Sequence, residues 1–162
     1  MTASEDDQPP PSHIRVEDST GADADRWAAL AARVLADEGV SGDAEMGLLF
    51  VDEERMAALN REHMGAEGPT DVLSFPIDGA QAAAGGLVGD VVICPAVAAR
   101  NAADHSREVD DEMALLVVHG VLHLLGMDHA EAAEAEAMRD REKHHLAAAG
   151  SERGLRGRGT QG

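Results

Sequence analysis

The spacing of apolar and polar residues along the chain predicts four β-strands and five α-helices. Short apolar runs favour strands, whereas apolar residues three or four positions apart favour helices. We expect strands at residues 13–17, 44–52, 70–76 and 87–94. We expect helices at residues 22–40, 52–64, 95–106, 108–126 and 130–150.

Two expected strands follow one another in mid-chain, and the last three helices are consecutive. This segregation predicts an α+β domain, with a small mixed β-sheet and about five helices, rather than a doubly wound fold. The helix at 108–126 is apolar nearly all round, so we expect it to be central and buried. We expect one domain over residues 13–150, between a disordered acidic tail at 1–12 and a disordered Arg/Gly tail at 151–162.

Composition and charge narrow the possible functions. The chain has 162 residues, 44% of them hydrophobic, which is enough for one core. Its aromatic residues are only Trp27, Phe50 and Phe75, so no aromatic platform for base stacking is expected. Because a net charge of −18 repels phosphate backbones, composition alone argues against a general nucleic-acid binder.

Neither a secreted nor a membrane protein is indicated. Cys94 is the only cysteine, which excludes an intramolecular disulfide and favours a reducing compartment. The first residues lack the basic and apolar regions of a secretory signal, and no apolar run approaches the roughly 18 residues of a membrane span. We therefore expect a cytoplasmic protein without a membrane partner.

The segment HGVLHLLGMDH, residues 119–129, places three histidines in an apolar stretch. His119 and His123 are four residues apart, so on a helix both rings lie on one face. Gly126 can end the helix in the left-handed conformation, and the chain can then return with His129 as a third ligand. Three imidazoles leave one tetrahedral position open, as in catalytic zinc sites. We predict one Zn²⁺ ion, although such ligands also accept nickel or copper.

Metzincin peptidases share this histidine spacing, and in them a glutamate after the first histidine is the general base. The corresponding residue here is Gly120, which offers no carboxylate to a metal-bound water. A metalloprotease is therefore less favoured than other metal-dependent activities.

Other polar residues near these segments allow more than one interpretation. Asp128 could orient a histidine ligand or cap the next helix. In a regular strand only one of Asp71 and Ser74 can face the site, and Asp90 could be structural. Four other histidines are interpreted as surface residues: His13, His105, His144 and His145. The last two are adjacent in the sequence, which is not a chelating spacing.

The segment HGVLHLLGMDH resembles the H-G-x-L-H-L-x-G-x-D-H signature of the YbeY family, zinc-dependent endoribonucleases of bacterial rRNA maturation. PTDVLSFP at 69–76 and GDVVI at 89–93 resemble two further family segments, so the resemblance covers roughly residues 13–148. It implies a mixed-sheet domain, a three-histidine zinc site and single-strand-specific cleavage in 16S rRNA 3′-end maturation and ribosome quality control. The implied partners are rRNA, the small ribosomal subunit and its assembly factors, and not DNA.

One departure from the family pattern concerns catalysis. Family members commonly carry an aromatic–arginine pair before the P-T-D segment, and that arginine is thought to act on RNA phosphate. The equivalent residues here are His63 and Met64, and a thioether cannot neutralise a phosphate. Arg61 is a possible substitute, although it also reads as an exposed helical arginine.

The catalytic groups beyond zinc-bound water thus stay unassigned. The candidates are Asp128, Asp71, Ser74 and Arg61. Because of the acidic charge and the missing arginine, a non-catalytic zinc-containing protein that binds during ribosome assembly remains an alternative.

Overall fold

The computed structural model describes residues 13–40, 42, 44–77, 87–127 and 132–157, with side chains up to residue 148. Nine elements follow one another in the predicted order. They are β1 (His13–Asp18), α2 (Ala24–Asp37), β2 (Glu45–Phe50), α3 (Glu53–Met64), β3 (Val72–Pro76), β4 (Leu87–Ile93), α5 (Pro95–Asp104), α6 (Val109–Leu124) and α7 (Ala132–Gly157).

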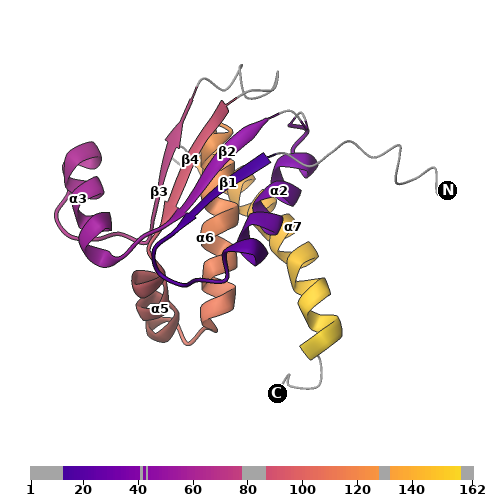
Figure 1. Cartoon of the computed structure of the whole chain (residues 1–162). Helices are drawn as coiled ribbons and strands as arrows, with labels where there is room; N and C mark the ends of the chain where they lie inside the picture. Colours follow the sequence, from indigo (N-terminus) through magenta and orange to yellow (C-terminus); the bar gives the residue numbers. More distant parts are fainter. Residues whose placement is uncertain (1–12, 41, 43, 78–86, 128–131, 158–162) are drawn as a thin grey trace.

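The four strands form one mixed sheet in the order β1-β2-β4-β3 (Figure 1). The pairs β1–β2 and β2–β4 are parallel, whereas β3 and β4 are antiparallel. The α+β class with a small mixed sheet and five helices is therefore confirmed for the described part of the chain.

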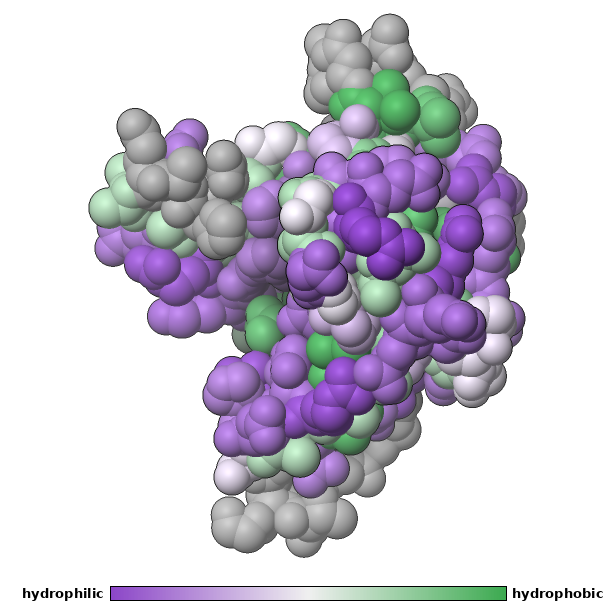
Figure 2. Space-filling model, turned by 90° about the vertical axis from the view of Figure 1, so that its left-hand side faces the viewer, coloured by the Kyte–Doolittle hydropathy of each residue, from purple (hydrophilic) through white to green (hydrophobic). Residues whose placement is uncertain are grey.

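Alternating side chains give the sheet two different faces. Residues on one face pack with α2 and α6 in the main core: Met46, Leu48, Phe50, Val91 and Ile93. Residues on the opposite face pack in a smaller cluster with Met56 of α3: Leu49, Leu73, Phe75 and Val92. Figure 2 shows the side of the molecule that α3 occupies, and its surface is largely hydrophilic. The larger core thus lies on the α6 side of the sheet.

Helix α6 is the central helix of the main core. Ten of its sixteen residues are buried, and it contacts α2, α5 and α7 as well as β3 and β4. This confirms the buried, central position predicted from its apolar sequence. The helix therefore offers a rigid base for any polar side chain near its end.

Helix α7 extends to Gly157, beyond the expected end of the domain at residue 150. The expected acidic tail at 1–12, the loop at 78–86 and residues 158–162 lie outside the described residues.

In the part of the chain that the structure describes, no helix has the length and apolar character needed to cross a membrane.

Candidate metal centre

His119 and His123 lie on the last turns of α6, where their ring centroids are 4.6 Å apart. Beyond them, Gly126 adopts a φ of 94°, as predicted for the residue that ends the helix. Its N–H donates to the carbonyl of His123, and the N–H of Met127 donates to that of Leu122. These two bonds form a Schellman motif, which reverses the chain directly after the histidine pair.

The predicted third ligand, His129, and its neighbour Asp128 lie outside the described residues. The structure therefore brings together two of the three predicted ligands.

Glu142 of α7 forms a hydrogen bond with Nδ1 of His119, and both side chains are largely shielded from solvent. When Nδ1 carries the proton, the ring donates to the carboxylate and presents the lone pair of Nε2. Metal-binding histidines typically have such a carboxylate partner, which fixes the ring orientation. The donor set on α6 and α7 therefore fits zinc.

The sequence does not indicate Glu142 as a site residue, because the Ala/Glu-rich pattern of this helix is typical of a solvent-exposed helix. The buried Met138 lies four residues before Glu142, and the buried His145 lies three residues after it. This spacing marks one face of a helix. The sequence therefore places Met138, Glu142 and His145 on one face of a helix. It does not indicate which other helix that face packs against.

Gly120 has a packing role that the sequence did not indicate. A Cβ atom at this position would lie 2.7 Å from Cγ1 of Val91 and 3.4 Å from Cγ2 of Val72. Glycine thus allows α6 to approach the sheet closely, beside the two histidines. The hydroxyl of Ser74 donates to the carbonyl of Gly120 over 3.0 Å and adds a tie between β3 and α6.

Asp71 and Ser74 make contacts with different helices. Ser74 contacts α6 through Gly120, next to His119 in the sequence. The Asp71 carboxylate instead accepts hydrogen bonds from Asn101 of α5 and from the N–H of Val72. Of these two candidates, Ser74 is the one that the described contacts place beside the histidine helix.

Arg61, Met64 and Asp90 belong to the side of the sheet opposite α6. Arg61 and Met64 are exposed on α3, which packs opposite α6. Asp90 pairs with Arg15 over 2.9 Å across Gly47. Asp90 is therefore part of a surface ion pair.

The prediction that His145 is a surface residue is wrong. Its side chain is only 1% exposed because α7 packs it against the end of α2, where its Nε2 lies 2.6 Å from Glu38. His144 is exposed, as predicted. Nor does their adjacency exclude chelation, because His144, His145 and Asp37 have ligand atoms within 4.8 Å of one another.

Glu38 stays ionised beside His145. Burial acts to raise the pKa of Glu38, but the hydrogen bonds from His145 and Arg141 outweigh it and hold this pKa below its usual value. The lowered pKa therefore favours the carboxylate form, which accepts a hydrogen bond from the imidazole.

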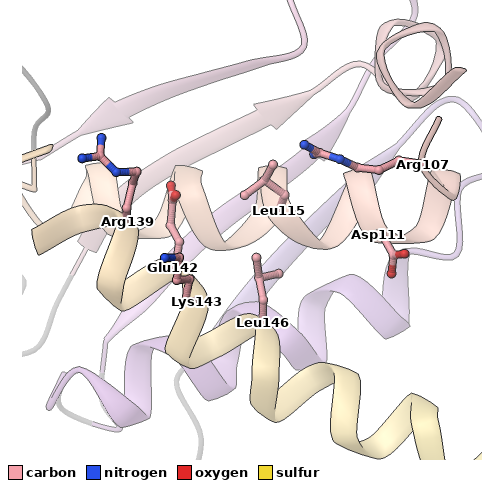
Figure 3. Close-up of a pocket in the computed structure, with 7 residues that line it drawn as sticks. All are labelled: Arg107, Asp111, Leu115, Arg139, Glu142, Lys143 and Leu146. Atoms are coloured by element: carbon pink, nitrogen blue, oxygen red, sulfur yellow. The ribbon is translucent and has the colours of Figure 1, made fainter. Parts of the chain in front are cut away.

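A pocket of about 380 Å³ lies along α6 and α7 and includes Glu142 (Figure 3). Leu115 and Leu146 point toward each other, with Arg139 and Arg107 at opposite ends. The lining has three cationic and two acidic side chains: Arg107, Arg139, Lys143, Asp111 and Glu142. This excess of cations beside the His119 partner contrasts with the net charge of −18.

Comparison with known proteins supports the resemblance seen in the sequence. The family model described as Endoribonuclease YbeY matches residues 13–150. Endoribonuclease YbeY of Salinispora tropica is 49% identical over 138 residues, 77% of this chain and 88% of that protein. The protein of the same name from Thermobifida fusca is 48% identical over 128 residues, 75% and 83% of the two chains.

A solution structure of a Thermotoga maritima protein has a similar fold. It aligns with a TM-score of 0.62 and 26% identity, covering 82% of this chain and 86% of that one. Together with the family match, this likeness extends over nearly all the described elements. The chain belongs to the YbeY endoribonuclease family.

Proposed function

We propose that this protein is a cytoplasmic, zinc-dependent endoribonuclease that cleaves single-stranded RNA in 16S rRNA 3′-end maturation and ribosome quality control. The observation that carries the proposal is the His119–His123 pair, with Glu142 bonded to His119, in a chain of the YbeY family. The partners are rRNA, the small ribosomal subunit and its assembly factors.

His119, His123 and His129 would hold one Zn²⁺ ion. Bound there, zinc supplies Lewis-acid chemistry, which polarises a phosphoryl oxygen and lowers the pKa of water. Glu142 holds the His119 ring in orientation through Nδ1. The close approach of α6 to the sheet at Gly120 keeps the histidine helix rigid.

The cations of the α6–α7 pocket would contact RNA phosphates near the histidines. Arg139 and Lys143 are exposed on the helix that carries Glu142, so both can reach an anionic backbone. They would supply the positive charge that Met64 lacks. Ser74 donates to the Gly120 carbonyl, which suits a positioning role better than proton transfer.

A non-catalytic zinc-containing protein of ribosome assembly is the second candidate function. The exposed Met64, at the position where the family commonly carries an arginine, favours it. Under this alternative the protein binds rRNA without cleaving it.

The two candidates are separated by incubating zinc-loaded wild type with single-stranded 16S precursor RNA, the same sequence as a duplex, and casein. His123→Ala tests the site, and His105→Ala is a matched control because His105 is exposed on α5's C-terminal side. We expect wild type and the control to cut only the single strand, and His123→Ala to be at least roughly 100-fold slower. RNA binding without cleavage by the wild type would support the second candidate, and cleavage of casein would support a peptidase. Equal RNA cleavage by His123→Ala would contradict the proposed site.

A further inference from the structure

We propose that Asp37, His144 and His145 form a second metal site, which takes a borderline divalent ion such as Zn²⁺ between the end of α2 and α7. These three residues offer ligand atoms within 4.8 Å of one another. The site is separate from the histidine pair of α6 and does not depend on the proposed nuclease function.

The first argument is the Nδ1 atom of His145. The side chain is 1% exposed, and among the described residues Nδ1 has no hydrogen-bond partner. The nearest carboxylate oxygen that pairs with it is Oδ2 of Asp37, at 3.8 Å, which is too long for a hydrogen bond. A buried ring nitrogen without a partner is unfavourable, and a metal ion between the two groups would satisfy both.

The second argument is the tautomer that Glu38 imposes. Nε2 of His145 lies 2.6 Å from Oε2 of Glu38, and Arg141 donates to the same oxygen over 2.8 Å. The carboxylate therefore accepts a hydrogen bond from the Nε2–H group of His145. The unprotonated nitrogen, which can bind a metal, is then Nδ1. A histidine that donates one ring N–H to a carboxylate and offers the other nitrogen is the usual arrangement of a metal ligand.

The geometry needs a small contraction on binding. Ligands about 2.0–2.1 Å from a tetrahedral ion lie about 3.4 Å from one another. Asp37 and His144 are exposed, so their side chains can move toward the buried His145, and solvent can supply the fourth ligand. The rings of His144 and His145 are already 5.0 Å apart between centroids.

The ligand chemistry selects the ion. Two imidazoles and one carboxylate suit Zn²⁺, Co²⁺ or Ni²⁺, whereas Mg²⁺ and Ca²⁺ prefer sites built from oxygen alone. An ion here would pin α7 to α2. Because Glu142 lies three residues before His145 on α7, the same ion would help to hold Glu142 against His119.

Counting bound Zn²⁺ in the full chain by equilibrium dialysis and elemental analysis tests the site. We expect two ions in the wild type, and one in Asp37→Ala and in His144→Ala, whose residues are exposed and can be replaced without disturbing the core. His105→Ala, another exposed histidine, should keep two. If the variants at Asp37 and His144 bind as many ions as the wild type, with unchanged affinity, the second site does not exist.

The outcome also separates this site from the one on α6. One ion in the wild type and none in His144→Ala would support the second site and count against the first. One ion in both would overturn the second site.

A ¹⁵N NMR spectrum of the histidine rings gives an independent readout. Zn²⁺ should shift Nδ1 of His145 in the wild type but not in His144→Ala. An Nδ1 that carries a proton at pH 7.5 and does not respond to Zn²⁺ would instead show a metal-free ion pair with Glu38 and Asp37.

Discussion

Helices α6 and α7 each carry two histidines, but the two pairs are built in opposite ways. On α6 the helical spacing brings His119 and His123 together, and a buried helix holds them. On α7 the histidines are adjacent, and tertiary packing buries one and exposes the other. The spacing of residues within a helix therefore predicts only the ligands that the helix itself supplies. Ligands contributed by a second element depend on how the elements pack.

The largest expected effect is a loss of stability on substitution in α6, the buried helix of the two. In Gly120→Val the new side chain would meet Val91, so we expect a loss of about 1–3 kcal/mol in the free energy of unfolding from overpacking. Ala147→Val, on an exposed position of α7, is the control and should cost less than about 1 kcal/mol. Urea unfolding followed by circular dichroism measures both, and equal losses would show that α6 is no more constrained than α7.

Removing the contact between Glu142 of α7 and His119 of α6 should have a smaller effect, which is seen in the affinity for zinc. Glu142→Ala removes the partner of His119, and we expect zinc to bind about 10–100-fold more weakly at the α6 site. Competition with a chelator measures this affinity. The measurement uses proteins that also carry His144→Ala, so that only the α6 site should bind zinc. Glu136→Ala, an exposed carboxylate on the same helix, should leave the affinity unchanged. An equal affinity in Glu142→Ala would remove α7 from the proposed zinc site.

The smallest expected effect is that of a single exposed cation. Arg139→Ala should reduce the slope of log affinity against log salt for single-stranded RNA by about 0.7, the value of one phosphate contact. Arg55→Ala on α3, which lies on the other side of the sheet, should not change the slope. If both variants behave alike, the α6–α7 pocket does not contact the RNA.

The elements and the histidine pair could be predicted from sequence because they follow from local rules. Helical periodicity placed His119 and His123 on one face, and the conformational freedom of glycine placed the helix end at Gly126. The order of strands and helices along the chain also follows from local sequence patterns. The sequence thus contained the frame of the α6 site.

The partners of these residues could not be predicted, because they depend on which surfaces meet. Glu142 has the same side chain as its exposed neighbour Glu136, and only the packing of α7 on α6 distinguishes them. The burial of His145 likewise depends on the end of α2, more than 100 residues away in the chain. The sequence alone shows that Gly120 offers no carboxylate, whereas its closeness to Val91 depends on how α6 packs on the sheet.

The close approach of α6 to β4 at Gly120 limits which side chains this position can carry. Introducing the glutamate that metzincin peptidases use at this position would force the helix away from Val91 or require a smaller residue there. A glutamate at position 120 should therefore cost stability through overpacking against Val91, and a smaller residue at position 91 should reduce that cost.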